Sequence, residues 1–290
     1  MIRSLLYVPA SSERFISKAH ERGADALILD LEDSVAPHQK DKARAGLREA
    51  VPAVSRNGAT VFVRINSEQA MLLADAEAAC LAGAFGLFVP KANDPAALKR
   101  LAQHLEEVER AMPKREKTAL VPMIEDPGAV LDARALAGAT PRVFGMITGA
   151  EDLATAMGAE PTPEVLRFPK LMVHLAAKAA GVLSFGLLRS VADYRDLEGI
   201  TRAAQEARAF GFDGASCVHP SVVPILNEAF APSAEELARA QRMILAYEES
   251  LAAGKGACVF EGKMIDVPVV NRARALLAKQ SRGKNRSQSV

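Results

Sequence analysis

The sequence predicts an α/β fold, a closed (β/α)8 TIM barrel with a C-terminal helical extension, from three observations. Eight short runs rich in Val, Ile, Leu, Phe and Tyr begin about 30 residues apart, which is the length of one βα repeat. Helical patterns separate most of these runs, and near-continuous apolar strands alternating with helices are typical of a parallel sheet. The length of 290 residues suits one such barrel with an extension.

The eight expected strands follow one another from the N-terminus. They are SLLYVP from Ser4, ALILDL from Ala26, TVFVRI from Thr60, GLFVP from Gly86, ALVPMI from Ala119, VFGMIT from Val143, VLSFGL from Val182 and ASCVHP from Ala215. Eight units favour a closed barrel over an open doubly wound sheet. The first strand is followed by P-A-S-S instead of the G-x-G-x-x-G of a dinucleotide-binding sheet.

Amphipathic patterns predict helices between the strands. Residues 12–24 carry one apolar stripe before Gly23, residues 94–112 place leucine at i, i+3 and i+7, and residues 196–214 reach a helix stop at Gly211. Glycine just past the last helical turn is a usual C-terminal signal.

The chain continues after the eighth strand with two more helical patterns. Ser233 and Glu236 have capping-box spacing at the start of a long helix, and Pro268 suits the first turn of a last one. We therefore expect a barrel over residues 1–230, and a helical extension with a lid segment over residues 231–280. The lid would cover the barrel mouth or that of a neighbour, and the polar residues 281–290 would form a disordered tail.

Composition excludes several classes of protein. The formal net charge of +1 gives no electrostatic argument for nucleic acid or for an anionic membrane. No apolar run approaches the ~20 residues that span a bilayer, and no signal peptide is recognisable. Three distant cysteines are typical of reduced thiols in a cytoplasmic protein, and five isolated histidines argue against a histidine-rich metal site.

Charged side chains stand where the apolar runs stop. They are Glu32 and Asp33, Arg64, Lys91, Glu125, and Glu151 with Asp152. A charge at the end of a buried strand is costly unless it reaches a polar cavity. Since parallel strands end at one rim of a barrel, the pattern predicts an active site there. Carboxylates with an arginine indicate a divalent metal and an anionic substrate.

Glu125 and Asp152 are the expected metal ligands, because they follow the fifth and sixth strands and are neighbours in a barrel. Oxygen ligands without Cys or His suit Mg²⁺, or Mn²⁺ as an alternative. A helix cap remains the alternative for Asp152, and a cap or turn for Glu125. Gly149 and Ala150 precede a helix whose N-terminal amides would bind a substrate carboxylate.

The other rim charges have two interpretations each. Adjacent Glu32 and Asp33 would orient metal-bound water or shift a local pKa, or else cap the next helix. An arginine inside a β-branched run is rarely structural unless it is paired, so Arg64 is expected to hold a carboxylate or an oxoacid. Lys91 would meet a substrate anion or an internal carboxylate, and His219 is expected to form a strand-end turn.

These residues together resemble the HpcH/HpaI aldolase/citrate lyase superfamily, in its citrate lyase β-subunit-like branch. The matching pieces are RSLLYVPA, ALILDLEDSVAPHQKDKAR, VFVRIN, VPK, the glutamate of MIED, GAEDL, GFDGASCVHPSVVPILNEAFAPS and GKMIDVPVVNRA. The resemblance implies a homotrimer or larger assembly and Mg²⁺ on Glu125 and Asp152. It also implies Glu32 and Asp33 near the metal's water, Arg64 on the oxoacid, and Asp266 as an acid/base in a neighbouring subunit's site.

The resemblance implies a carbon–carbon lyase that cleaves a 3-hydroxyacyl-CoA thioester to acetyl-CoA and a 2-oxoacid by retro-Claisen chemistry. Citramalyl-CoA is the first expectation, and malyl-CoA or citryl-CoA comes next. The aldolase branch carries a histidine base in an E-H pair, whereas this chain has Glu32-Asp33, which favours the thioester branch. The segments GAEDLA and VHPS differ from the corresponding motifs of citrate lyase β subunits, and this difference favours a stand-alone enzyme. The alternatives are a class II aldolase acting on free 4-hydroxy-2-oxoacids and a β subunit of a multi-component citrate lyase.

Overall fold

The computed structural model describes residues 1–112 and 116–287, with side chains through Ala278. The chain divides into two compact units, one spanning Ile2–Phe230 and a second beginning at Ala231 and including Met1. Each unit has its own apolar cluster, and each is described by itself.

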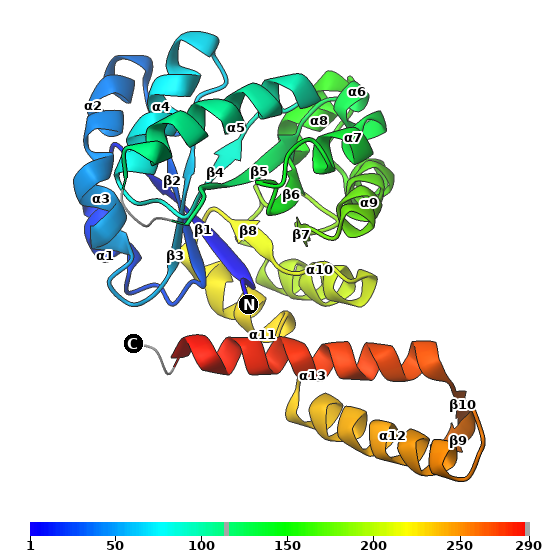
Figure 1. The fold of residues 1–290 in the computed structure, drawn as a ribbon. Coiled ribbons are helices and arrows are strands. Elements are labelled where there is room, and N and C mark those ends of the chain that lie inside the picture. Colours follow the sequence, from blue (N-terminus) through cyan, green and yellow to red (C-terminus); the bar gives the residue numbers. More distant parts are fainter. Residues whose placement is uncertain (113–115, 288–290) are drawn as a thin grey trace. The chain divides into compact units, whose positions relative to one another are not determined.

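The first unit contains eight parallel strands in the order β7-β6-β5-β4-β3-β2-β1-β8 (Figure 1). They are β1 (Ser4–Pro9), β2 (Ala26–Asp30), β3 (Thr60–Arg64), β4 (Gly86–Val89), β5 (Ala119–Ile124), β6 (Gly145–Thr148), β7 (Leu183–Phe185) and β8 (Ala215–Cys217). A parallel bridge between Phe185 and Gly214 connects the two ends of this order and closes the ring. The predicted (β/α)8 barrel is confirmed, and each strand lies within the run expected for it.

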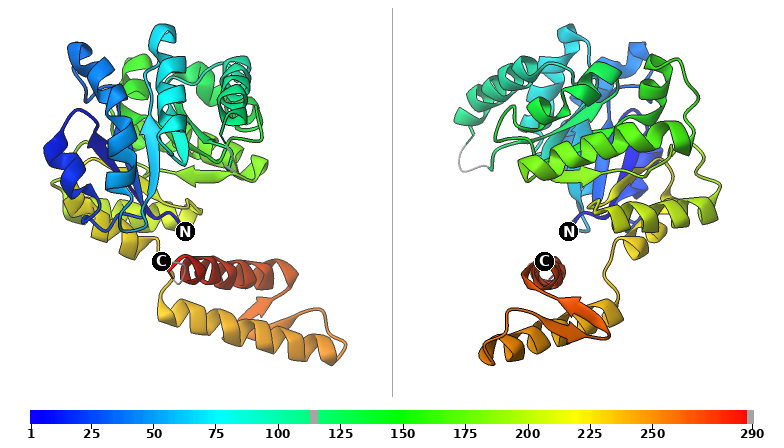
Figure 2. Two further views of the ribbon diagram at one scale, coloured as in Figure 1. Left: turned by 60° about the vertical axis from the view of Figure 1, so that its left-hand side comes forward. Right: turned by 90° about the vertical axis from the view of Figure 1, so that its right-hand side faces the viewer.

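The helices of this unit lie around the outside of the strands (Figure 2). They are α1 (Glu13–Ala19), η1 (Pro37–Gln39), α2 (Lys40–Ala45), α3 (Leu47–Val54), α4 (Gln69–Leu81), α5 (Pro95–Arg110), α6 (Pro127–Leu131), α7 (Ala133–Ala137), α8 (Ala150–Ala156), α9 (Pro163–Ala180), α10 (Leu197–Phe210), η2 (Pro220–Val222) and α11 (Val223–Ala229). Gly211 ends α10 in the left-handed conformation with φ of 96°, as predicted. Helix α1 stops earlier, with His20 as its C-cap, so Gly23 lies in the following turn.

Strand alternation separates two apolar layers. Ala26 and Ile28 belong to an inner cluster with Phe62 and Phe88, whereas Leu27 and Leu29 belong to the larger cluster that includes helix residues. Side chains two residues apart share a face of a strand. The residue that follows Ile28 on the inner face is therefore Asp30, at the carboxyl end of β2.

The second unit is a helical hairpin around a short antiparallel ribbon. It contains α12 (Ala234–Ala252), β9 (Cys258–Phe260), β10 (Lys263–Ile265) and α13 (Val267–Ser287). Ser233 and Glu236 form the expected capping box. Helix α13 continues to Ser287, so the expected tail of residues 281–290 is helical over its first seven residues, and residues 288–290 lie outside the described residues. Within the described ranges, no helix has both the length and the apolar character needed to cross a membrane.

Candidate active site at the carboxyl ends of the strands

Arg64, the last residue of β3, is held by three carboxylates. Its Nε and Nη2 donate to Oδ1 and Oδ2 of Asp30, each at 2.7 Å, in the two-point arrangement that arginine makes with a carboxylate. Its Nη1 lies 2.9 Å from Oε2 of Glu32 and 3.0 Å from Oδ2 of Asp33. The structure therefore brings Glu32, Asp33 and Arg64 together, and the guanidinium has a fixed orientation.

Asp30 organises this part of the rim, although it was not among the residues predicted from the sequence. Asp30 and Arg64 are directly paired in the β2–β3 register, and Asp30 also accepts from the backbone N–H of Glu32 at 3.0 Å and of Ser34 at 3.2 Å. Burial opposes ionisation of Asp30, but the hydrogen bonds and the charge of Arg64, together with the hydrogen bonds from Ser34 and Glu32, lower the pKa of the carboxyl. The sequence feature that could have identified Asp30 is its position two residues after Ile28, which places both side chains on the inner face of β2.

Glu125 follows β5 and is buried, with a 5% exposed surface. Its Oε2 accepts a hydrogen bond of 2.7 Å from the backbone N–H of Lys91, a residue in the left-handed conformation with φ of 50°. Its Oε1 lies so close to Gly149 that a Cβ there would be only 2.5 Å away. Burial raises the pKa of Glu125 to about 7, and the nearby charge of Asp152 adds to the shift.

The structure shows where the two expected metal ligands lie relative to the N-caps of the helices that follow them. Helix α6 is capped by Asp126, whose carboxylate accepts from the N–H of Ala129 at 2.9 Å, so Glu125 is not the cap. Asp152 lies in the first turn of α8, whose N-cap is Gly149, and its charge interacts with that of Glu125. Neither carboxylate is therefore the N-cap of its helix, and metal binding by the two residues stays a prediction.

The rim carries an excess of negative charge. Burial raises the pKa of Glu32 to about 8, and the carboxylates of Asp33 and Glu125 add to the shift. Neither Glu32 nor Asp33 caps the helix that follows, since Ala36 is the N-cap of η1. Buried carboxylates that repel one another are stabilised by a cation, so these residues fit a divalent metal ion.

The protein ligands of such an ion would be few. Among the described residues, no group of three or more His, Cys, Asp or Glu side chains is arranged to hold a metal. Mg²⁺ suits this arrangement, because it is usually bound through one or two carboxylates and keeps water or substrate oxygens in its other positions. Glu125 and Asp152 are the residues that would hold it.

Tyr7 is a second residue that the sequence analysis did not single out. The guanidinium carbon of Arg64 lies 5.1 Å from the centre of the Tyr7 ring. The Tyr7 and Phe88 rings pack edge to face, with their centres 6.3 Å apart. A cation over an aromatic face is attracted to it, so the ring supports Arg64 from β1. Burial raises the pKa of Tyr7, so the phenol is neutral. In the sequence, a tyrosine inside a strand run is indistinguishable from a core residue.

Other expected site residues are placed differently. The side chain of Lys91 is exposed, and its backbone N–H, not its ammonium, contacts Glu125. Ala150 begins α8, as expected for an anion-binding helix start. Asp266 lies in the second unit before α13, where its Oδ1 is 3.4 Å from the backbone N of Val269. His219 caps the short helix η2 through the N–H of Ser221.

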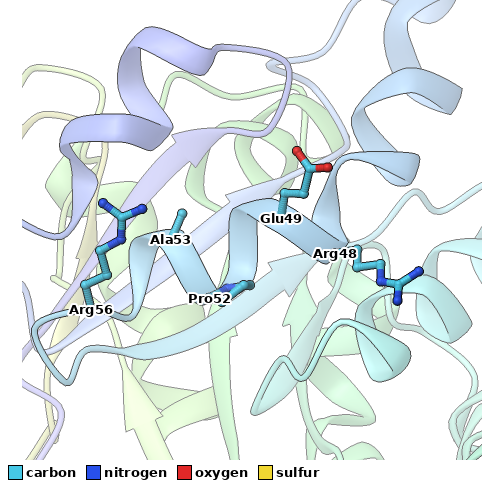
Figure 3. A pocket seen from close by; sticks show the side chains of 5 residues that line it. All are labelled: Arg48, Glu49, Pro52, Ala53 and Arg56. Atoms are coloured by element: carbon cyan, nitrogen blue, oxygen red, sulfur yellow. The ribbon is translucent and has the colours of Figure 1, made fainter.

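A surface depression elsewhere on the barrel is not part of this rim. It is lined along α3 and the turn after it, by Arg48, Glu49, Pro52, Ala53 and Arg56 (Figure 3). None of the site residues predicted from the sequence lines it, and its wall comes from a single short helix. The chemistry-bearing residues gather instead where β2, β3, β5 and β6 end.

Comparisons with known proteins agree with this fold. The family model described as HpcH/HpaI aldolase/citrate lyase matches residues 3–220. The (3S)-malyl-CoA thioesterase of Cereibacter sphaeroides is 34% identical over 96% of this chain and 94% of its own length. The mitochondrial citramalyl-CoA lyase of Homo sapiens is 28% identical over 94% and 83%. The crystal structure of protein CitE from Mycobacterium tuberculosis with magnesium, acetoacetate and coenzyme A has a TM-score of 0.76 and 32% identity, over 95% of this chain and 96% of that one.

Proposed function

The chain belongs to the HpcH/HpaI aldolase/citrate lyase family and is a carbon–carbon lyase, and from this premise we propose that it cleaves a 3-hydroxyacyl-CoA thioester with Mg²⁺. The single observation that carries the proposal is the rim itself. There the guanidinium of Arg64 has a fixed orientation, and burial together with neighbouring carboxylates raises the pKa of the carboxyl groups of Glu32 and Glu125. An oxoacid with a metal ion complements both features, because one supplies a carboxylate and the other a double positive charge.

In this proposal, Glu125 and Asp152 bind the ion, and Mn²⁺ is an alternative to Mg²⁺. When bound, the metal polarises the oxygen of the oxoacid fragment as a Lewis acid. Glu32 and Asp33 orient its water ligands. The magnesium in the structure of protein CitE supports this choice of ion.

Arg64 contributes through its orientation. Asp30 holds the guanidinium at two points and the Tyr7 ring packs against it, so the charge needs little rearrangement when the substrate arrives. A charge fixed before reaction stabilises developing negative charge more effectively than a mobile one. Gly149 and Ala150 would bind the substrate carboxylate at the start of α8, and the exposed ammonium of Lys91 would attract the anion.

In the proposed step the C3 hydroxyl gives its proton to the Asp266 carboxylate as the C2–C3 bond breaks, which leaves the 2-oxoacid and releases the acetyl-thioester as an enolate. We assign protonation of the enolate carbon to Asp266, contributed by a neighbouring subunit of a homotrimer. Citramalyl-CoA would yield acetyl-CoA and pyruvate, and malyl-CoA or citryl-CoA would yield acetyl-CoA with glyoxylate or oxaloacetate. The citramalyl-CoA lyase relative supports the first of these substrates. We expect the enzyme in the cytoplasm.

The test is a product analysis with the purified protein, Mg²⁺ and each of the three thioesters. Acetyl-CoA and the matching 2-oxoacid are expected from one of them in equal amounts, and EDTA should abolish both. Free 4-hydroxy-2-oxoacids run in parallel test the aldolase alternative. Cleavage of these acids alone, without any thioester cleavage, would contradict the proposal. Activity only after addition of citrate lyase partner subunits would instead identify a component of a multi-subunit enzyme.

A second candidate function is hydrolysis of the thioester bond, favoured by the similarity to the (3S)-malyl-CoA thioesterase. Hydrolysis releases free CoA and the intact hydroxyacid, whereas lyase chemistry releases acetyl-CoA. The same product analysis separates the two, since a thiol reagent detects free CoA and chromatography detects acetyl-CoA. Free CoA with malate and without glyoxylate would establish the hydrolase.

A further inference from the structure

Lys170 is a buried cation that the proposed chemistry does not use. It lies on α9 with a 5% exposed surface, and its Nζ donates to the backbone carbonyls of Leu187 at 3.0 Å and Arg189 at 2.9 Å. No carboxylate among the described residues is within salt-bridge distance of it. Burial lowers the pKa of its ammonium to about 8. Burying a charge without a paired carboxylate is costly, so its presence requires an explanation other than packing.

Both carbonyls belong to the loop that follows β7. This loop spans residues 186–196 at the carboxyl end of its strand, the same rim that carries Arg64, Glu125 and Asp152. Helix α9 packs against β6 and β7 and also contacts α8 (Figure 1). Lys170 therefore reaches the loop from a helix of the outer layer. The ammonium therefore determines where the loop backbone lies.

The loop in turn contacts both neighbouring strand ends. The hydroxyl of Ser190 donates to Oε1 of Glu151, the residue before Asp152 in the first turn of α8. On the other side, the Tyr194 ring stacks on His219 after β8, with centroids 4.7 Å apart and planes inclined by 13°. The contact with Glu151 connects the segment held by Lys170 directly to the helix start that carries a proposed metal ligand.

Lys170 also acts on this helix start through its charge. Glu151 is the carboxylate whose electrostatic interaction with the ammonium opposes the effect of burial. A positive charge near Glu151 and a hydroxyl bound to it together restrain the first turn of α8. Groups that orient a ligand without touching the metal are a usual part of metal sites, and their loss typically weakens metal binding roughly 10- to 100-fold.

We propose that Lys170 is a positioning residue for the metal site. By holding the carbonyls of Leu187 and Arg189, it places Ser190 against Glu151 and so orients the carboxylate of Asp152. This inference rests on the proposed function, in which Asp152 binds the ion. It adds a residue on the buried face of α9 to the set of residues on which metal affinity depends, although this residue is not itself a proposed ligand.

The test is a pair of measurements on the full chain carrying Lys170→Met, a change that keeps an unbranched chain one atom shorter than that of lysine and removes the donors. Calorimetric titration of the EDTA-treated protein with MgCl₂ should show affinity roughly 10- to 100-fold below wild type. Hydrogen exchange should be faster at residues 187–191, with the protection of the β-strands retained. Lys170→Arg, which keeps the charge and donors, should restore both values. A lysine with only a structural role would change the protection of the strands and leave Mg²⁺ affinity unchanged.

Two further variants keep the test decisive. Lys178→Met is the matched control, since this lysine lies on the same helix but pairs with Asp213, and it should leave Mg²⁺ affinity unchanged. Ser190→Ala cuts only the contact with Glu151 and should weaken Mg²⁺ binding several-fold, even if Lys170→Met does not fold. Wild-type affinity in a folded Lys170→Met protein and in Ser190→Ala would overturn the inference. If the wild-type protein itself binds no Mg²⁺, the metal assignment under Proposed function fails separately, and unchanged exchange at residues 187–191 would then overturn the role of Lys170.

Discussion

Substitution of Gly149 by alanine tests the geometry of the site through one methyl group. Gly149 has φ of −76° and ψ of 110°, which alanine adopts without strain, so only the space around the new Cβ matters. That Cβ would lie 2.5 Å from Oε1, 2.6 Å from Cγ and 2.9 Å from Cδ of Glu125. All three distances are below 3.0 Å, a limit that real Cβ contacts essentially never cross, so the Glu125 side chain must move.

The cost follows from what Glu125 loses by moving. Because Cγ is too close as well as the carboxylate, rotation of the terminal group alone does not relieve the clash. The hydrogen bond of 2.7 Å from the Lys91 N–H is then lost, which costs about 1.5–3 kcal/mol for a bond to a charged group. We expect the free energy of unfolding to fall by about 2 kcal/mol and Mg²⁺ affinity to fall at least tenfold, since the displaced carboxylate is a proposed ligand.

Urea unfolding and calorimetric titration with MgCl₂ measure the two effects. Gly46→Ala is the matched control, because a Cβ there meets only two carbonyl oxygens at the ordinary distance of 3.5 Å. Its stability and Mg²⁺ affinity should stay close to those of the wild type. A Gly149→Ala protein with unchanged stability and unchanged Mg²⁺ affinity would refute the steric reasoning and the position assigned to Glu125.

Three further predictions concern separate features. Asp266→Ala should leave Mg²⁺ and oxoacid binding intact while kcat falls by about 10²–10⁴, the usual range for a lost acid/base; loss of metal binding would contradict the role assigned to Asp266. Lys91→Gly removes the backbone strain of a non-glycine residue with φ of 50° and keeps the N–H that binds Glu125, so the free energy of unfolding should rise by about 1 kcal/mol. A measured destabilisation would instead show that the lysine side chain stabilises the fold. The pKa of Lys170 is about 8 when folded and 10.5 when unfolded, so the unfolded state holds this proton more tightly. The cost of burying the charged amine is full below pH 8 and disappears above pH 10.5, so the free energy of unfolding of the wild type should rise across this window by about 3 kcal/mol relative to Lys170→Met. Urea unfolding of both proteins at a series of pH values would measure this rise. Parallel pH curves for the two proteins would contradict the burial of a charged amine.

The eight apolar runs show which parts of the fold the local hydrophobic pattern predicts. Each of the eight apolar runs became a strand, because a segment buried on both faces must be apolar along its whole length. The charges that ended the runs lie at one rim because parallel strands in a barrel all point the same way. Glu32, Asp33, Arg64 and Glu125 were found in this way, from residue type and position alone.

The contacts that the rim residues make with one another depend on neighbouring strands, not on the pattern of one strand. Arg64 was expected to hold a carboxylate or an oxoacid, and within the chain its guanidinium is bound to the carboxylate of Asp30 on the adjacent strand. Lys91 was expected to meet a substrate anion or an internal carboxylate, and within the chain its backbone N–H contacts the carboxylate of Glu125. Both outcomes depend on the register between adjacent strands, which a single strand's pattern does not contain.

The sequence by itself determined the barrel, the rim on which the site lies and most of the charged residues there, because hydrophobic periodicity and burial cost act along the chain. Only the tertiary structure decided four contacts. They are the two-point pairing of Asp30 with Arg64, the packing of the Tyr7 ring against Arg64, the space that the Glu125 side chain occupies beside Gly149, and the hydrogen bonds of Lys170 to the loop after β7. Each of these depends on distances of a few ångströms between segments far apart in the chain. Such distances arise from strand register and helix packing, which many sequences with the same apolar pattern would set differently.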